Sequence, residues 1–149
     1  MIMKNGITVK RLDDGMLPDV AHIERECFAE PWSEKSLTIL TREGGVAFAA
    51  LDGERAVAYG GMLTVLDEGQ ITNVATLSDY RRMGLAREIM GALESYGREN
   101  GIALLTLEVR ASNTAAIELY SSMGWTECGR RKGFYRFPSE DAILMEKTL

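Results

Sequence analysis

Two hydrophobic periods alternate along this chain and mark its predicted elements. Apolar residues that recur at every second position indicate a strand, and apolar residues that recur every three or four positions indicate a helix. Ser33 is a suitable N-cap for a short helix that ends at Gly44-Gly45, and Asp52-Gly53 is a hairpin signal. In chain order, the first half predicts a strand over 7–12, helices over 17–28 and 33–43, a hairpin over 46–66 and a strand over 69–77.

The second half has a different pattern, with helices placed between strands. A long amphipathic helix is expected over 83–101, and its apolar stripe is Leu85, Ile89, Met90, Leu93 and Tyr96. A strand over 102–109, a helix over 113–123 and strands over 124–135 and 142–149 complete the prediction. A strand, helix and strand in succession imply a parallel crossover. We therefore predict an α+β (mixed α/β) fold in a single domain, residues 1–149, with a mixed, mostly antiparallel sheet and helices on both faces.

Composition narrows the class of protein. The 149 residues are 46% hydrophobic and 26% charged, as in a globular protein, and no run of 18 apolar residues occurs. We therefore expect a cytoplasmic protein that does not bind membranes. The net charge of −5 argues against nucleic-acid binding and is compatible with a cationic partner. His22 is the only histidine, and Cys27 and Cys128 are not clustered, so no metal site is expected.

The stretch "SDYRRMGLAR" suggests an anion-binding loop at the start of the long helix. Unpaired N–H groups and the positive end of the helix dipole attract phosphate groups, and Gly84 and Ala86 would let a phosphate approach the backbone. The stretch is neither a P-loop nor a dinucleotide fingerprint. A solvated, basic helix start is the alternative interpretation.

Several motifs carry a resemblance to a known family. "RRMGLA" resembles the Arg/Gln-x-x-Gly-x-Gly/Ala pattern of the GCN5-related N-acetyltransferase (GNAT) superfamily. "PWSEKS", "DEGQITNVAT", "LEVRASNTAAIELY", "RRK" and "PSEDAILM" are similar to one bacterial branch, the RimI-type ribosomal-protein-alanine N-acetyltransferases. The resemblance extends from about Cys27 to the C-terminus, and 107–120 is its most specific part.

The resemblance implies a GNAT fold with splayed strands at the cofactor site and acetyl-coenzyme A as co-substrate. The strand before the loop would pair its backbone with the pantetheine arm, and the loop would hold the pyrophosphate. The implied pantetheine positions are Val74, Ala75 and Thr76, and the implied pyrophosphate positions are Arg81, Arg82, Met83, Gly84, Leu85, Ala86 and Arg87.

Glu108 and Tyr120 are candidates for acid–base chemistry. Acetyl transfer needs a deprotonated amine and a protonated leaving thiolate, and a carboxylate and a phenol can serve these two steps. Glu108 is expected near the C-terminal end of its strand, and Asn113 at the start of the following helix. By resemblance, Glu108 is the proton acceptor, Tyr120 the proton donor and Asn113 a cofactor contact. The alternatives are a solvated strand glutamate and a core tyrosine.

An extended protein N-terminus is the acceptor that the resemblance implies, in particular the N-terminal alanine of a small-subunit ribosomal protein with a basic tail. The candidate acceptor-binding residues are Trp32, Glu34, Tyr135, Glu140 and Asp141. Phe134 departs from the branch pattern, which usually has tyrosine there. Trp32 could instead anchor the core, and Glu140 and Asp141 could simply form a turn.

Because no cysteine lies in the motif region, we expect direct transfer in a ternary complex, carried out by a monomer. Two other hypotheses remain open from the sequence. One is an acetyltransferase that acts on a small amine or a lysine side chain, and the other is a coenzyme A-binding sensor without turnover.

Overall fold

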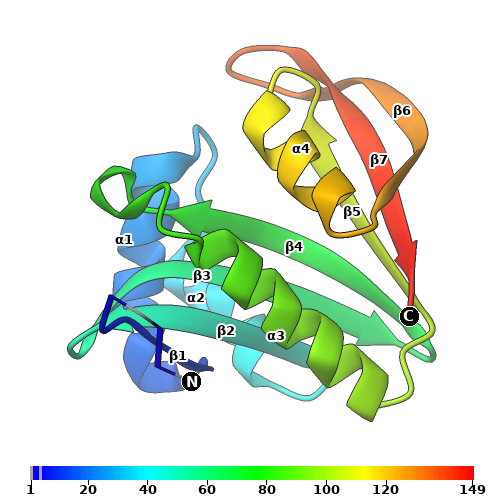
Figure 1. Cartoon of the computed structure of the whole chain (residues 1–149). Helices are drawn as coiled ribbons and strands as arrows, with labels where there is room; N and C mark the ends of the chain where they lie inside the picture. Colours follow the sequence, from blue (N-terminus) through cyan, green and yellow to red (C-terminus); the bar gives the residue numbers. More distant parts are fainter. Residues whose placement is uncertain (1, 4) are drawn as a thin grey trace.

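A seven-stranded sheet with the strand order β1-β2-β3-β4-β5-β7-β6 organises the chain (Figure 1). The computed structural model describes residues 2–3 and 5–149. The strands are β1 (Thr8–Arg11), β2 (Gly45–Asp52), β3 (Arg55–Val65), β4 (Glu68–Thr76), β5 (Leu104–Arg110), β6 (Thr126–Tyr135) and β7 (Glu140–Thr148). The helices are α1 (Leu17–Cys27), α2 (Glu34–Leu37), α3 (Leu85–Glu99) and α4 (Thr114–Ser122), with 3-10 turns η1 (Asp14–Met16), η2 (Thr38–Thr41) and η3 (Ser78–Tyr80).

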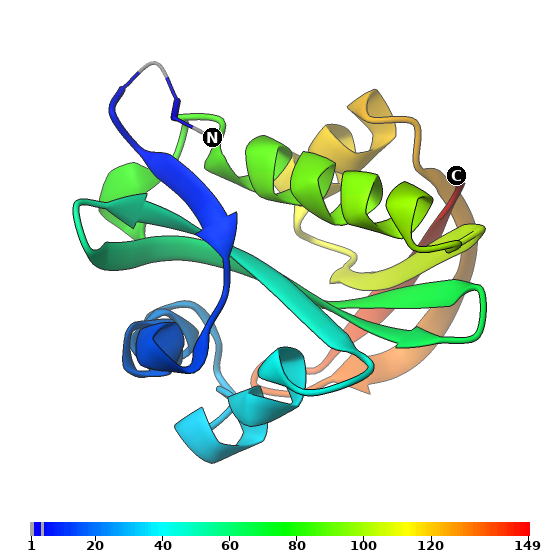
Figure 2. The ribbon, with the colours of Figure 1, turned by 90° about the horizontal axis from the view of Figure 1, so that it is seen from below.

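Helices cover both faces of this sheet. In Figure 2, α1 and α2 lie below the strands, and α3 and α4 lie above them. The side of α3 that meets the sheet buries Leu85, Ile89, Met90 and Leu93, which confirms four positions of the predicted stripe. The mixed α/β class, the largely antiparallel sheet and the helices on both faces are therefore as predicted from the sequence.

The sheet opens between β4 and β5. These two strands are parallel, as the predicted crossover requires, but they pair only from Glu68–Gln70 to Leu104–Thr106. Beyond Gln70, β4 pairs with β3 alone, and its register shifts between Gly60 and Met62. β5 remains paired with β7 along its whole length. The facing edges of β4 and β5 therefore diverge toward their C-terminal ends and leave backbone groups available to a ligand.

Several element boundaries differ from the prediction by one or more residues, and two of these differences have a clear physical reason. Ser33 caps the second helix as expected, because its Oγ accepts from the Ser36 N–H at 3.1 Å, but α2 ends at Leu37 and continues to Thr41 as a 3-10 turn. β7 begins at Glu140 rather than at 142, because Glu140 already pairs with Tyr135 across the β6–β7 hairpin. Of the helices in the described ranges, none has the combined length and apolar character of a bilayer-spanning segment.

A buried carboxylate joins α1 to the open edge of the sheet. Glu24 is fully buried, and its Oε1 accepts from the backbone N–H of Trp32 at 2.8 Å. Its Oε2 accepts from the Tyr59 hydroxyl at 2.6 Å and from Nδ2 of Asn73 at 3.0 Å. Burial, with Glu24 beside it, raises the pKa of Tyr59 far above its usual range, so this hydroxyl remains a donor. Glu24 thus fixes the α1–α2 loop and Asn73 of β4 relative to each other.

We expect Glu24→Gln to lower the free energy of unfolding by about 2–3 kcal/mol, because a glutamine amide offers one acceptor oxygen where the carboxylate offers two, and its NH2 would meet other donors. Urea unfolding measures this change. Glu26→Gln, two residues along the same helix, removes an exposed carboxylate and should change stability by less than about 0.5 kcal/mol. Equal effects of the two variants would contradict the proposed role of Glu24.

Candidate active site

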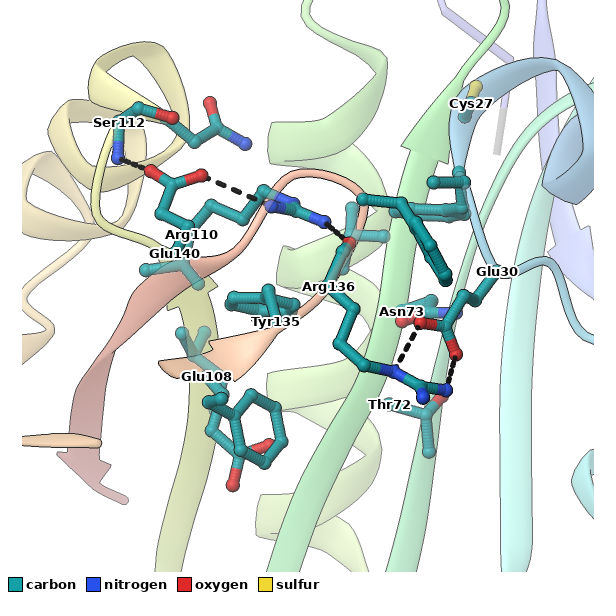
Figure 3. Close-up of a pocket in the computed structure, with 18 of the residues that line it drawn as sticks. Cys27, Glu30, Thr72, Asn73, Glu108, Arg110, Ser112, Tyr135, Arg136 and Glu140 are labelled. Atoms are coloured by element: carbon teal, nitrogen blue, oxygen red, sulfur yellow. Dashed lines mark hydrogen bonds and ion pairs between the residues drawn. The ribbon is translucent and has the colours of Figure 1, made fainter. Parts of the chain in front are cut away.

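A cleft of about 770 Å³ occupies the gap between β4 and β5. Its walls are the diverging strands, the α1–α2 loop, the segment between β6 and β7, and the start of α4. The residues that line it come from 27–32, 71–74, 107–113 and 134–140, together with Tyr120. Figure 3 shows these side chains converging from both halves of the chain.

Glu108 and Tyr120 both line this cleft. Strand alternation buries Leu107 and Val109 and turns Glu108 into the cleft, where its side chain remains 21% exposed. Tyr120 is only 7% exposed, and this burial, together with nearby Tyr135, raises the pKa of its hydroxyl to about 12. The cleft therefore combines a carboxylate with a phenol that is protonated at neutral pH.

Asn113 is the N-cap of α4. Its Oδ1 accepts from the Ala116 N–H at 3.2 Å, which confirms the predicted cap. Because Asn113 also lines the cleft and capping uses only its oxygen, its amide nitrogen can donate to a ligand.

The predicted anion loop lies at the C-terminal end of β4, beyond the cleft. Arg82 and Gly84 both have left-handed backbone angles, with φ of 64° and 78°, and Gly84 is the N-cap of α3. Left-handed residues in such a loop can turn successive N–H groups toward one point, and an anion binds there. No side chain caps α3, so the N–H groups of its first turn are available to an anion.

The arginines of this loop point in different directions. Arg81 Nε donates to the Thr76 carbonyl at 3.1 Å, and Arg87 Nη2 donates to the Ser122 hydroxyl at 2.7 Å. These two side chains therefore brace the loop against β4 and α4. Arg82 is exposed, and within the described part of the chain it has no hydrogen-bond partner. Met83, Leu85 and Ala86 complete the loop, with Leu85 buried in the core.

Val74, Ala75 and Thr76 lie where β4 has lost its pairing with β5. They pair with Gly60, Tyr59 and Ala58 of β3 on one side only. Their other edge faces the gap, so it can pair with amide groups of a bound molecule, as the resemblance to the GNAT family implied. Of the three residues, Val74 also lines the cleft.

The acceptor candidates are placed in two groups. Trp32, Tyr135 and Glu140 line the cleft, whereas Glu34 lies in the first turn of α2 and Asp141 faces away. Strand alternation separates Asp141 from Glu140. The Asp141 carboxylate accepts instead from Arg130 at 3.1 Å and from the Gly133 N–H at 3.0 Å.

Cys27 also lines the cleft, although the sequence has no cysteine within the motif region. It is the last residue of α1, and the fold brings this helix end to Thr76 of β4, whose carbonyl accepts from the Cys27 thiol at 3.5 Å. Burial raises the pKa of this thiol, which disfavours the nucleophilic thiolate.

Arg110 is a central residue that sequence reasoning missed. It donates to the carbonyls of Pro138 at 3.0 Å and Arg136 at 2.8 Å, and its guanidinium lies 4.6 Å from the centre of the Tyr135 ring. It also pairs with Glu140 at 3.2 Å, and Glu140 in turn accepts from the Ser112 N–H. Arg110 therefore fixes the β6–β7 segment and the turn before α4. The sequence held one signal for this role: Arg110 is two residues after Glu108 on the same strand, so both side chains point to the same face of the sheet.

Glu30 and Arg136 form a second unexpected contact. Two N–H groups of the Arg136 guanidinium donate to the two carboxylate oxygens of Glu30, each at 3.0 Å (Figure 3). The pair joins the α1–α2 loop to the β6–β7 segment. Because the two partners are 106 positions apart in the chain, no local sequence pattern could have indicated the contact. Among the residues placed by the structure, no three His, Cys, Asp or Glu side chains gather as a metal site would require.

A splayed mixed sheet, a helix start without a side-chain cap after the opened strand, and a cleft with a carboxylate and a phenol match the architecture expected of a GNAT acyltransferase. The family model described as Acetyltransferase (GNAT) family matches residues 17–125. The chain belongs to this family and is an acyltransferase of the GNAT type.

Named relatives cover nearly the whole chain. The ribosomal protein bS18-alanine N-acetyltransferase of Escherichia coli (strain K12) is 39% identical over 140 residues, which is 93% of this chain and 95% of the relative. The crystal structure of the ribosomal-protein-S18-alanine N-acetyltransferase from Escherichia coli has a TM-score of 0.89 and 38% identity, covering 95% of this chain and 93% of that one. NAA60 from Arabidopsis thaliana, in complex with acetyl-CoA, shares the fold with a TM-score of 0.87 at 20% identity, and the match covers 96% of this chain and 98% of that one.

We expect Arg110→Lys to loosen the β6–β7 segment, because an ammonium cannot reproduce the forked donor set of a guanidinium. The loss of one charge-assisted hydrogen bond should reduce the protection of the backbone amides at 133–137 about tenfold. Hydrogen–deuterium exchange measures this protection. Arg130→Lys changes the same hairpin outside the cleft and should have a smaller effect. Unchanged exchange in Arg110→Lys would disprove the role of Arg110.

Proposed function

We propose that this enzyme transfers the acetyl group of acetyl-coenzyme A to the α-amino group of a protein N-terminus, in particular the N-terminal alanine of a small-subunit ribosomal protein. The observation that carries the proposal is that Glu108 and Tyr120 line one cleft, at the place where β4 and β5 separate. The name of the Escherichia coli relative supports alanine of bS18 as the acceptor. Acting on a ribosomal protein, the enzyme would work in the cytoplasm. All the proposed groups come from one chain, so a monomer suffices.

The cofactor would bind along the open edge of β4 and at the start of α3. The left-handed residues Arg82 and Gly84 and the uncapped first turn of α3 suit a pyrophosphate, and the free edge at 74–76 suits the amides of the pantetheine arm. Asn113 would donate to the same arm. When bound, acetyl-coenzyme A supplies an activated thioester. The NAA60 structure with acetyl-CoA supports this use of the fold.

Glu108 would act as the proton acceptor and Tyr120 as the proton donor. An α-amino group with a pKa of about 8 is partly protonated near neutrality, so a carboxylate that accepts its proton increases the nucleophilic fraction. Tyr120 would deliver a proton to the departing sulfur. A phenol with a pKa of about 12 is a weak donor, but the burial that disfavours the phenolate would also disfavour a thiolate in the same cleft.

Transfer would be direct, because the thiol of Cys27 is protonated and already donates to Thr76. Cys27→Ala should therefore retain turnover, and no acetylated enzyme should accumulate with acetyl-coenzyme A alone. Accumulation of such a species at Cys27 would disprove direct transfer.

The acceptor is tested by offering acetyl-coenzyme A with four amines side by side: an Ala-starting peptide, the same peptide with a blocked N-terminus and an internal lysine, a polyamine and an aminoglycoside. Mass measurement should detect acetylation of the α-amino group of the first peptide alone. Preferred acetylation of lysine or of a small amine would replace the proposed acceptor. Retained biological function after replacement of both Glu108 and Tyr120 would instead indicate a sensor.

Tyr120→Phe should lower kcat about 100-fold, the scale of a lost general acid, with little change in the KM for acetyl-coenzyme A. Because the raised pKa keeps the phenol protonated below about pH 12, the contribution of Tyr120 should persist across pH 7–10, where an ordinary tyrosine would begin to ionise. Steady-state rates of both proteins over this range measure it. A fully active phenylalanine variant would disprove the general-acid role.

Gly84→Val should weaken acetyl-coenzyme A binding at least about tenfold, because a β-branched residue resists the left-handed backbone that the loop requires. Calorimetric titration gives the Kd. Gly53→Val is a matched control, since Gly53 is also left-handed, with φ of 64°, but lies in the β2–β3 turn. Comparable losses of affinity in both variants would argue against a cofactor role for the loop.

A further inference from the structure

Three carboxylates line the cleft, and each of them lies beside an arginine. The pairs are Glu30–Arg136, Glu108–Arg131 and Glu140–Arg110. A basic acceptor therefore does not meet free negative charge in this cleft. To bind one of these carboxylates, it must replace an arginine that is already there.

The three pairs differ in how readily they can exchange. Arg110–Glu140 is mostly buried and carries further hydrogen bonds, so it is part of the framework. In the Glu30–Arg136 pair, by contrast, the side chains are 48% and 70% exposed. An exposed ion pair contributes at most about 1 kcal/mol, because water solvates both partners when they separate. Glu108–Arg131 is a looser contact, at 3.9 Å, but Glu108 is the proposed proton acceptor. The Glu30–Arg136 pair is therefore the one outside the proposed catalytic pair that a ligand can open at low cost.

Glu30, rather than Arg136, is the group suited to recognise a ligand. The backbone of Arg136 is held by Arg110, and its guanidinium lies 5.6 Å from the centre of the Phe137 ring. Arg136 therefore keeps a favourable position when it leaves Glu30. Hydrogen bonds from Arg136 lower the pKa of Glu30, so this carboxylate is charged at neutral pH. The net charge of −5 also favours the approach of a cation.

We propose that Glu30 is a specificity-determining residue that binds a cationic side chain close to the N-terminus of the acceptor, and that Arg136 occupies this position in the free enzyme. The inference rests on the proposed function, because it takes the cleft to be the site of a peptide acceptor. Arginine is the side chain that best matches it, since its guanidinium reproduces the two parallel hydrogen bonds that Arg136 makes.

The experiment compares peptide sets that begin with alanine and carry Arg, Gln or Glu at the second, third or fourth residue. Their Kd values are measured by calorimetry with the intact enzyme saturated with coenzyme A, so the readout does not depend on turnover. The variants are Glu30→Gln and Arg136→Gln. Asp14→Asn is the matched control, because it removes another exposed, arginine-paired carboxylate outside the cleft.

The two variants should have opposite effects on the Arg peptide that binds best. Glu30→Gln removes its partner and should weaken binding two- to fivefold, whereas Arg136→Gln removes its competitor and should strengthen binding by a similar factor. Peptides with Gln should bind both variants as they bind the wild type, and Asp14→Asn should change nothing.

If the Glu30–Arg136 ion pair had only a structural role, the two variants would not have opposite effects. Both variants break the Glu30–Arg136 contact, so they would then weaken all peptides alike, and this outcome would overturn the proposal. Equal Kd values for Arg, Gln and Glu peptides at all three positions would overturn it as well. If the opposite effects are found but no peptide is acetylated, the charge recognition by Glu30 stands and the proposed acetyltransferase function of the cleft fails.

Discussion

The short pairing between β4 and β5 is the constraint on which the site depends. Three residue pairs hold the two strands together at one end, and each strand is then supported only by its outer neighbour. Past these three pairs, the facing edges of β4 and β5 have no strand partner, so the sheet opens at this point. The cleft, the free edge of β4 and the inward-facing Glu108 all result from this one divergence.

Hydrogen bonds of Glu24 and Arg110 hold the segments on the two sides of this opening. Glu24 connects the α1–α2 loop to β4 on one side, and Arg110 connects β5 to the β6–β7 segment on the other. Both residues bond backbone groups of segments that have no regular secondary structure. Such segments cannot satisfy their own polar groups, so charged side chains from neighbouring helices and strands do so. Glu24 and Arg110 therefore hold the walls of the cleft in place, whereas the Glu30–Arg136 pair is exposed to solvent and can separate more easily.

The periodic parts of this fold could be predicted from the sequence, and the contacts between distant loops could not. Leu85, Ile89 and Leu93 identified α3, and the hydrophobic pattern over 102–123 predicted the strand and helix that carry Glu108 and Tyr120, because local order encodes these elements. The resemblance to the GNAT family, not the pattern, pointed to the roles of these two residues. Glu30–Arg136 and Glu24–Asn73 join residues far apart in the chain, so no local pattern reports them. Asp141 was assigned to the acceptor side with Glu140, although the alternation of β7 separates the two.

The position of β7 has a consequence for how the enzyme forms. This strand follows β6 in the chain but lies between β5 and β6 in the sheet. Until it is inserted, β5 and β6 each present an unpaired edge, and the segment that carries Tyr135 and Arg136 lacks the strand that follows it. During synthesis, the half that contains β1–β4 and α3 can therefore order first, whereas the half that contains β5 and β6 is complete only after β7 has been made.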